Sequence, residues 1–281
     1  MKAIVVLTPT ESKKLIATAL HRLPEVQSAL QNGMVAIHPS SSTYFLYEAI
    51  TSSRPEGLWV CGVVSHQGLC GSMEAVKMIR SRGAGPHDPR DVSKETWVFD
   101  HGVLQPQMPL GEILDKMTQS DVYIKGVNAL DPNGKVGVLF SNPAGGGGTI
   151  GKVMAAKRKK NFHVLYPVGN EKRIGVPIQQ AAHAIGFQKA DLCMGIPAAL
   201  LPVSGKKIDE TDAYRILYGV EATPLAAGGL AQAGGCLTMV LDGPKDSVAE
   251  AFAFSCQIKG TKLPQLALPE EKGEFYPMLR L

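Results

Sequence analysis

The chain has 281 residues, of which 44% are hydrophobic and 19% charged, and its formal net charge is +4. These proportions are ordinary for a globular protein with a sizeable core, and they argue against intrinsic disorder. The small charge and the 6% aromatic content give no nucleic-acid footprint. They remain compatible with a small anionic ligand.

Cysteine usage and hydropathy indicate the compartment. Five cysteines are scattered along the chain, at Cys61, Cys70, Cys193, Cys236 and Cys256. An odd, scattered set is typical of free thiols in a reducing compartment. The apolar run at residues 3–7 ends too early for a signal peptide, and no window reaches the ~18–20 apolar residues of a membrane helix. We therefore expect a cytoplasmic protein without membrane contact.

Caps and apolar periodicity predict alternating helices and strands in the N-terminal part. Thr8, Pro9 and Glu11 supply the hydroxyl cap, the first-turn proline and the first-turn carboxylate of a helix start. The further predictions are a buried strand over 34–37, a helix over 44–50, a buried strand over 58–64, a helix over 73–79, a polar loop with a possible lid role over 80–94, and a hairpin turn at Asp100-His101-Gly102. The turn is favoured over an acid–base role for Asp100 and His101.

A hydroxyl-rich loop follows the strand predicted over 34–37. It contains Ser40, Ser41, Ser42 and Thr43. A strand that leads through such a loop into a helix presents free N–H groups and hydroxyls to an anion. Plain helix capping explains the same residues equally well, because no glycine is present to let a phosphate approach the backbone. Both interpretations stay open.

Cys61, His66 and Cys70 are the candidates for a metal site. They lack the paired ligand spacing of structural zinc sites. Loop and core positions are the favoured interpretation, so no metal and no cofactor are predicted.

Polar residues also follow the strand predicted over 121–124. Lys125 and Asn128 lie at or just past its end, and Asp131 begins the reverse turn Asp131-Pro132-Asn133-Gly134. In a doubly wound sheet, ligands bind outside the carboxyl ends of the strands. Lys125 and Asn128 are therefore expected to orient an anion, and a polar turn is the alternative.

A glycine run precedes a helix predicted over 150–160. It consists of Gly145, Gly146, Gly147, Gly148 and Thr149. Small residues at a helix start let N–H groups converge on a phosphate or carboxylate. The run matches neither the Walker A nor the dinucleotide-binding pattern, so neither nucleotide is implied. An anion cradle is favoured over a flexible linker, because the loop is short and lies between regular elements.

Another strand is predicted over 162–168, and Glu171 and Lys172 follow it at the same sheet edge. The pattern then weakens. The remaining predictions are a helix over 177–185, an apolar segment over 193–203, a helix over 210–218, a second glycine-rich stretch over 219–235, a strand over 237–241, a helix over 247–254 and an irregular tail after Lys259.

These motifs resemble those of the NagB/RpiA/CoA-transferase-like superfamily. Ribose-5-phosphate isomerases of that superfamily carry an acidic turn, a glycine-rich loop that opens a helix, and a strand that ends near a lysine. The matching segments here are 126–131, 145–149 and 164–172, and Ser40–Thr43 resembles their phosphate loop. Gly-x-Asn-Ala followed by Asp-x-x-Gly, and the later Val-Gly-x-Glu-Lys, look still more like LUD-type (lactate-utilisation) proteins.

The resemblance implies an α/β fold, a Rossmann-like three-layer sandwich with a mostly parallel sheet over about 34–175. A smaller α+β portion over 176–281 would pack on it, so that 1–281 forms one unit. The departures limit the function that carries over. Lys125 and Asn128 replace the turn's acids, and Ile150-Gly151-Lys152 lacks the glutamate that follows the isomerases' glycine loop. Proton abstraction needs a positioned base, so ribose-5-phosphate isomerase activity itself is not expected.

The expected ligand is a small anionic metabolite that is phosphorylated, carboxylated or an acyl-CoA. In an isomerase- or transferase-type enzyme, Glu171 would be the acid, base or nucleophile and Lys125 would assist. Ser40–Thr43, Gly145–Thr149 and Lys172 would hold the anion. The alternative is a non-catalytic binding or accessory protein on the same fold, and an oligomeric structural or regulatory protein is a third hypothesis. Homo-oligomerisation is left open.

Overall fold

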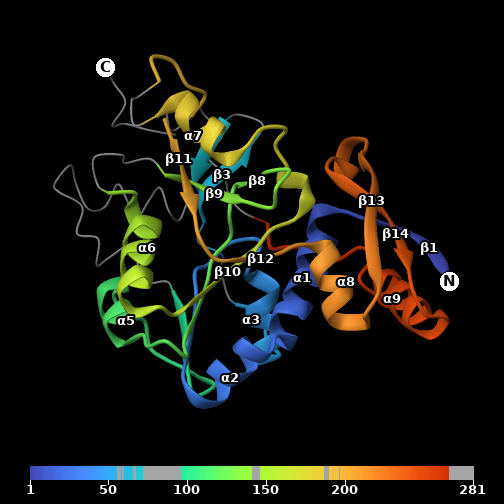
Figure 1. Cartoon of the computed structure of the whole chain (residues 1–281), viewed down its shortest axis with the longest axis horizontal. Coiled ribbons are helices and arrows are strands. Elements are labelled where there is room, and N and C mark those ends of the chain that lie inside the picture. The colour runs from blue at the N-terminus through green and yellow to red at the C-terminus, as the bar shows by residue number, and fades with distance from the viewer. Residues whose placement is uncertain are drawn as a thin grey trace.

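The computed structural model describes residues 1–55, 58, 60–65, 68–71, 96–140, 146–186, 190–195 and 197–265. They form a mixed α/β structure around a six-stranded sheet, with a separate three-stranded sheet beside it (Figure 1). The predicted α/β class is thus confirmed. Across these ranges no helix has the length and apolar content needed to cross a membrane. The helix predicted over 73–79 and the loop predicted over 80–94 lie outside the described residues.

The six-stranded sheet has the order β12-β10-β7-β2-β5-β6. Its strands are β2 (Met34–Ile37), β5 (Trp97–Asp100), β6 (Val103–Leu104), β7 (Val122–Ile124), β10 (His163–Pro167) and β12 (Lys206–Ile208). The first four in the order are parallel, β5 pairs antiparallel with β2, and β6 pairs antiparallel with β5. The chain goes from β2 to β5 on one side and returns to β7 on the other. Such a reversal of strand order is where parallel sheets bind ligands.

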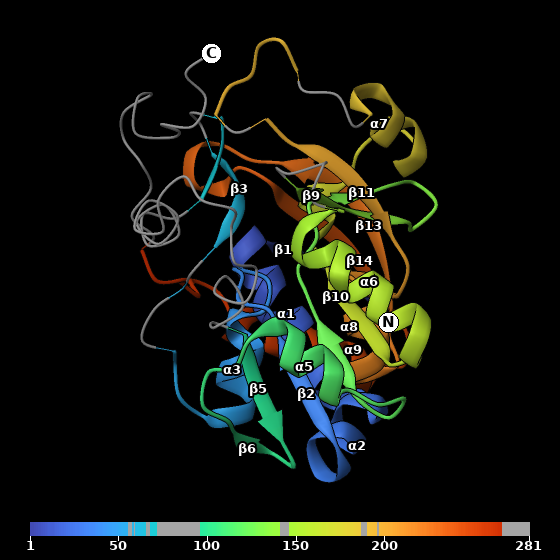
Figure 2. The same cartoon turned by 90° about the vertical axis from the view of Figure 1, so that its left-hand side faces the viewer.

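Helices cover both faces of this sheet. Alternate side chains of β2 and β7, such as Ile37 and Ile124, pack with α1 (Pro9–Arg22) and α3 (Tyr44–Thr51). The intervening side chains, such as Tyr123, pack on the other face with α5 (Leu110–Lys116) and α6 (Gly148–Lys160), which lie in front of the sheet in Figure 2. This period of two follows from strand geometry, and burial on both faces is what a parallel sheet requires.

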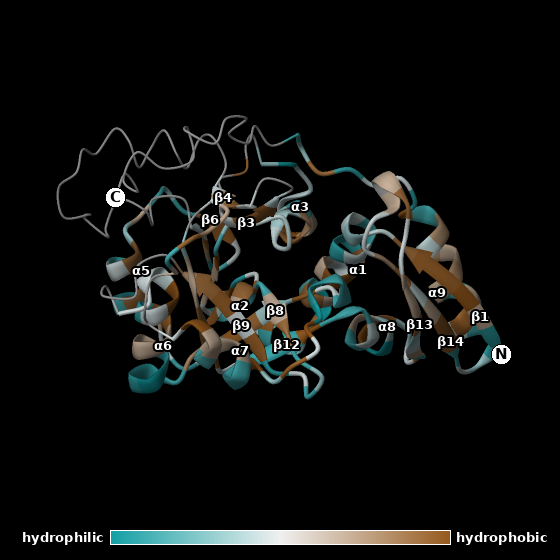
Figure 3. Cartoon of the chain, turned by 90° about the horizontal axis from the view of Figure 1, so that it is seen from above, coloured by the Kyte–Doolittle hydropathy of each residue, from teal (hydrophilic) through white to brown (hydrophobic). Residues whose placement is uncertain are grey.

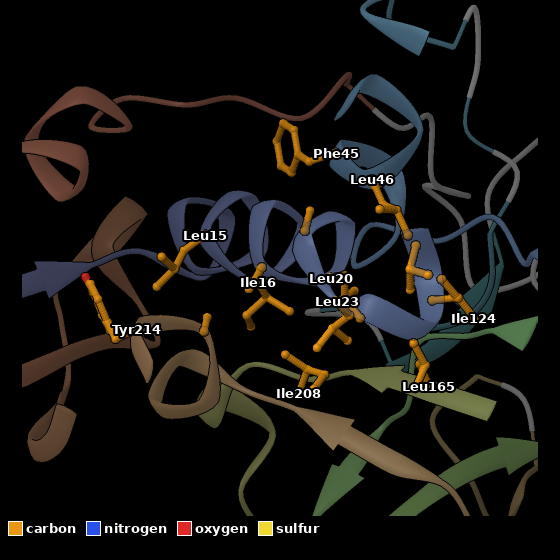
Figure 4. Packing of buried hydrophobic residues seen from close by; sticks show 14 of the residues in the cluster. Leu15, Ile16, Leu20, Leu23, Phe45, Leu46, Ile124, Leu165, Ile208 and Tyr214 are labelled. Atoms are coloured by element: carbon orange, nitrogen blue, oxygen red, sulfur yellow. The ribbon is translucent and has the colours of Figure 1, made fainter. Parts of the chain in front are cut away.

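Helix α1 joins the two main sheets. Its N-terminus carries the predicted cap, because Thr8 and Glu11 form a capping box. Its apolar side, including Leu15, Ile16 and Leu20, packs against α3 and towards Ile124 and Leu165 of the large sheet (Figure 4). Helix α2 (Pro24–Asn32) follows it directly.

The three-stranded sheet consists of β1 (Lys2–Leu7), β14 (Cys236–Asp242) and β13 (Glu221–Gly228), all antiparallel. Its inner face packs with α8 (Glu210–Tyr218) and α9 (Lys245–Gln257) and belongs to the same core as α1. Figure 3 shows α1 between this sheet and the larger one. The N-terminal and C-terminal segments of the described chain therefore share one hydrophobic core with the large sheet.

Two smaller sheets complete the described structure. One has the order β11-β9-β8, formed by β8 (Ala129–Leu130), β9 (Val136–Phe140) and β11 (Ala199–Val203). The other is the hairpin of β3 (Cys61–Ser65) and β4 (Gly68–Gly71). Helix α7 (Ile178–Ile185) follows the short 3-10 turn η2 (Asn170–Lys172), and a second 3-10 turn, η3 (Ala231–Ala233), precedes β14.

Most predicted elements are confirmed, and the exceptions depend on tertiary pairing. The strand over 34–37, the helix over 210–218 and the hairpin turn at 100–102 occur as predicted. The strand predicted over 58–64 occurs in part, as β3. Its prediction as a buried strand is wrong, because β3 pairs with β4 outside the large sheet and Val64 is 71% exposed. Strand β13 forms from the glycine-rich stretch, since pairing with β14 overrides the weak strand propensity of its Ala, Pro and Gly residues.

Candidate functional site

Three loops meet at the carboxyl edge of the large sheet. They follow the adjacent strands β2, β7 and β10. The Nζ atom of Lys172 donates hydrogen bonds to Ser42 Oγ at 3.1 Å and to the Val127 carbonyl oxygen at 2.8 Å. One lysine from the third loop therefore ties the other two together.

The loop after β2 folds its hydroxyls inward. The Thr43 hydroxyl donates to the carbonyl oxygen of His38 at 2.8 Å, and the Ser40 and Thr43 hydroxyl oxygens lie 3.1 Å apart. Ser42 is buried, and Ser41 is half-buried. Although Thr43 is the N-cap residue of α3, its side chain makes no capping hydrogen bond. The loop's hydroxyls therefore serve its own shape and Lys172 rather than the end of the helix.

Glycine is required where the β7 loop approaches the serine loop. A Cβ atom at Gly126 would lie 2.8 Å from Ser40 Oγ and 3.5 Å from Ser42 Cβ. The absence of a side chain at Gly126 lets the backbone of the β7 loop lie against the side chains of Ser40 and Ser42. This explains the glycine that follows Lys125.

Glu171 has the least usual environment among the described residues. Both carboxylate oxygens are buried, and neither has a hydrogen-bond partner. The side chain folds back over Gly169, and its Cβ lies 3.6 Å from where a Cβ of Gly235 would be. Gly235, which directly precedes β14, thus lies beside the Glu171 side chain. A buried polar group without a partner costs about 1–3 kcal/mol, more if charged, so such a group calls for a functional explanation.

Two further charged residues come from helices distant in sequence. Lys13 lies in the first turns of α1, and Glu210 is the first residue of α8. Glu210 is 1% exposed and accepts hydrogen bonds from the Asn170 backbone N–H at 3.0 Å and from Asn170 Nδ2 at 2.7 Å. Ser12 also hydrogen-bonds to it. We call Lys13, Glu171, Lys172 and Glu210 the edge cluster.

The charges of the edge cluster interact without pairing. The charge of Glu171 opposes the burial that lowers the pKa values of both lysines, so Glu171 lies near each of them. Yet in the part of the chain that the structure describes, no ion pair joins Lys13 or Lys172 to either carboxylate, and Lys13 makes no side-chain hydrogen bond. Two lysines and two carboxyl groups therefore lie near one another without an ion pair between them in the described structure.

Burial brings two of these groups close to neutral pH. It lowers the pKa of Lys172 to about 8, and the charge of Lys13 acts in the same direction. Burial and the neighbouring Glu171 raise the pKa of Glu210 to about 7. Burial also lowers the pKa of Lys13. Groups with pKa values shifted toward neutrality are suited to proton transfer, and they concentrate in active sites.

The other predicted residues of the β7 loop have different neighbours. Lys125 lies near His38, since its charge adds to the burial that lowers the pKa of His38. Asn128 uses both ends of its amide: Nδ2 donates to the Gly62 carbonyl oxygen and Oδ1 accepts from the Leu139 N–H, each at 3.0 Å. Asn128 thereby links β3 and β9 to the turn.

The glycine run opens α6 as predicted. Gly146, Gly147 and Gly148 all have positive φ angles, and Gly147 is the N-cap residue. Gly147 is buried, and a Cβ there would contact Leu201 of β11 at 3.3 Å. Thr149 lies in the first turn, and Gly145 lies outside the described residues. The described neighbours of this run are in β11 and α6, and no contact ties it to Glu171.

Asp131 serves its turn, as predicted. Its carboxylate accepts hydrogen bonds from the N–H groups of Asn133, Lys135 and Ile178, at 2.8, 2.8 and 3.1 Å. These bonds lower its pKa against the opposing effect of burial. Asp131 is therefore structural.

Sequence patterns missed Lys13 and Glu210. Lys13 looks like one of two solvated lysines on an amphipathic helix, and an acid at a helix start is expected from the helix dipole alone. Only the docking of α1 and α8 against the end of β10 brings them to Glu171. No spacing in the sequence carries that signal.

The remaining features do not form a second site. Among the residues that the structure covers, no group of three His, Cys, Asp or Glu side chains is arranged to hold a metal. Cys70 is buried in β4, whereas His66 and the side chain of Cys61 are outside the described part. An open depression lined by Thr118–Ser120 and His163 lies at the opposite, amino end of β7 and β10.

Comparison with protein-family models, with curated proteins and with solved structures finds no match to this chain. The fold and the edge cluster define the class of the protein as a mixed α/β protein with a charged site at the carboxyl ends of its parallel strands.

Proposed function

We propose that the protein is an enzyme that binds a small anionic metabolite at the edge cluster and uses Glu171 as acid, base or nucleophile. The observation that carries this proposal is the buried Glu171 carboxylate. Among the described residues it has no hydrogen-bond partner, and it lies near two lysines with which it forms no ion pair. A protein that needed only stability would gain by pairing or removing this charge.

The anion would lie against Lys13, Lys172 and the Ser40–Thr43 loop. Lys13 has no hydrogen bond or ion pair in the described structure, so an anionic group would give it a partner. With Glu210 protonated, two lysines face one carboxylate, which leaves the edge cluster with one net positive charge. Phosphate, carboxylate and acyl-CoA ligands all satisfy this requirement.

Glu171 would then act on the part of the ligand beyond its anionic group. A buried carboxylate that accepts no hydrogen bond from the described residues keeps its lone pairs available for a proton or an acyl carbon of the ligand. In an isomerase-type reaction it would remove a proton, and in a transferase-type reaction it would attack an acyl group. Lys125, which lies beside His38, is still proposed to assist Glu171 in this reaction.

The finer fold is part of the proposal. We place the chain in a Rossmann-like, three-layer arrangement of the NagB/RpiA/CoA-transferase-like type, with LUD-type proteins as the nearest resemblance, and in the cytoplasm. Four parallel strands with helices on both faces, and polar loops at their carboxyl ends, support it. Strand β12 and the β1-β14-β13 sheet extend this arrangement beyond residues 34–175.

A thermal-shift screen against sugar phosphates, small hydroxy acids and acyl-CoAs tests the proposal. A ligand at a hundredfold excess over its Kd should raise Tm by roughly 5 °C. Lys13→Met and Lys172→Met should each abolish the shift. Lys116→Met is the matched control, because it removes an exposed ammonium that pairs with Glu112. A shift that survives both edge-cluster substitutions would refute the site.

One observation favours a non-catalytic binding protein as the second candidate. Helix α6 has no acidic residue in its first turn, where the isomerases that the sequence resembles carry a catalytic glutamate. If the identified ligand is bound but not converted, and Glu171→Gln binds it as the wild type does, this second candidate is correct.

A further inference from the structure

We propose that Lys172 is a carbonyl-reactive lysine, whose amine forms an imine with an anionic ligand that carries an aldehyde or ketone near its charged group. This inference rests on the proposed function and names its substrate class. It starts from the partners of the Lys172 amine, which are neutral oxygens in a buried cluster.

The hydrogen bonds of Lys172 suit an amine that loses its proton. Its two acceptors are the Ser42 hydroxyl and the Val127 carbonyl oxygen. A carbonyl oxygen accepts from an ammonium and from an amine alike, and a hydroxyl can also donate to the lone pair of a neutral amine. A carboxylate partner would instead hold the proton on the lysine. The geometry therefore orients the nitrogen without fixing its charge.

The surrounding charges act together on Lys172. Burial and, to a smaller extent, the charge of Lys13 from α1 lower the pKa of Lys172 to about 8, although Glu171 and Glu210 oppose this change. At pH 7 roughly a tenth of such amines are uncharged, against fewer than about one in a thousand for an ordinary lysine. Desolvation beside another cation is a recognised way of activating a lysine for attack on carbonyl groups.

The edge cluster also supplies the proton transfers. The Lys172 nitrogen forms a bond to the carbonyl carbon, and Glu171 moves one proton from that nitrogen to the carbonyl oxygen. Glu210, as its neutral acid, then protonates the resulting hydroxyl, which leaves as water. The products are a protonated imine, a Glu210 carboxylate and one water molecule. No oxidant or reductant takes part.

Lys13 has a different part in this scheme. It makes no hydrogen bond in the described structure, so nothing orients its nitrogen, and it is placed to hold the anionic group. The two lysines can be distinguished by experiment, because Lys13 should affect binding and Lys172 should become covalently modified.

Reductive trapping tests the proposal on the full-length protein. Glycolaldehyde phosphate is the carbonyl probe, borohydride fixes the imine, and tandem mass spectrometry locates the adduct. Ethyl phosphate is the matched anion without a carbonyl, and its binding is followed by thermal shift. We expect a single adduct at Lys172, at least tenfold above that at exposed Lys116, and competition by ethyl phosphate. Lys172→Arg should lose the adduct, and Lys116→Met should keep it.

The outcomes separate the inference from the proposed function. If ethyl phosphate binds at the edge cluster but the adduct is absent from Lys172 or spread evenly over the surface lysines, the imine is wrong and the anion site stands. If Lys172 is modified selectively while ethyl phosphate neither binds nor competes, imine formation is supported and the proposed anion site is wrong. If neither occurs, both are wrong.

Discussion

Two lysines at neighbouring strands of the large sheet have opposite environments. Lys207 of β12 forms ion pairs with Asp209 at 2.7 Å and Asp212 at 2.6 Å, and these carboxylates raise its pKa despite partial burial. Lys172, after β10, donates to two neutral acceptors among the described residues, and burial lowers its pKa to about 8. Because β10 and β12 pair directly, the contrast arises within one sheet.

The comparison distinguishes the edge cluster from a structural group formed by Lys207, Asp209 and Asp212, which we call the Lys207 cluster. Asp209 caps α8 and forms a capping box with Asp212, so the Lys207 cluster fixes the start of that helix. The next residue, Glu210, enters the edge cluster. Within the described ranges, the same fold pairs Lys207 with carboxylates but forms no ion pair at Lys13, Glu171 or Lys172. Unpaired charges at this edge are therefore a feature of the site and not of the scaffold.

The largest expected effect is on turnover by the edge cluster. Glu171→Gln should lower kcat/KM for the ligand found by screening by about 10²–10⁴-fold, since it removes the base. Its stability should stay equal to that of the wild type or rise, because a buried charge without partners is lost. Steady-state kinetics and urea unfolding measure the two effects. Loss of stability with full turnover would assign Glu171 to the scaffold.

The opposite result is expected for the Lys207 cluster. Asp209→Ala removes the α8 cap and one partner of Lys207, and should lower the free energy of unfolding by about 2–4 kcal/mol. Turnover per folded molecule should change little by comparison. Urea unfolding checks this, with Lys116→Met as the surface control that leaves stability unchanged. Equal stability of Asp209→Ala and the wild type would remove the basis of the comparison.

Glu210 should make stability depend on pH between about 4.5 and 7. Its pKa is raised from 4.5 to about 7 on folding, so in this window the folded protein keeps a proton that the unfolded chain loses. Rising pH therefore destabilises the wild type, and the loss is complete above 7. Glu210→Gln should gain stability relative to the wild type across the window, by up to about 3 kcal/mol. A difference that stays constant with pH contradicts the raised pKa.

A small effect on stability is expected for Gly169→Ala. The new Cβ would take the place of the Glu171 carboxylate, which is the end of a flexible side chain and can move. Gly169 has an ordinary φ of −80°, so alanine causes no backbone strain. Tm should change by about 2 °C or less, while turnover falls as in Glu171→Gln. Unchanged turnover would show that the position of the carboxylate is unimportant.

The sequence predicts the parts of the structure that depend on local signals. The capping box at Thr8, the strand over 34–37 and the turn at Asp131 follow from residue types and spacing. Lys172 and Ser42 could be named because residues that follow parallel strands share one edge. Their direct contact agrees with that reasoning.

The rest depends on tertiary structure. Lys13 and Glu210 reach the site only because α1 and α8 dock at the end of β10. Strand β13 exists only because β14 pairs with it. Asn128 looks like a ligand-binding residue in sequence, yet its side-chain amide forms hydrogen bonds with two backbone groups. Such outcomes are decided by packing between distant segments, which residue spacing does not encode.

The pH at which each lysine becomes reactive tests the central claim most directly. Competitive acetylation with acetic anhydride, read by mass spectrometry, reports the titration of Lys172 and Lys207 in the same folded sample. The account predicts that Lys172 becomes reactive with a midpoint at about pH 8, and Lys207 only above the usual lysine pKa of 10.5. Titration of Lys172 together with Lys207, or above it, would contradict the account.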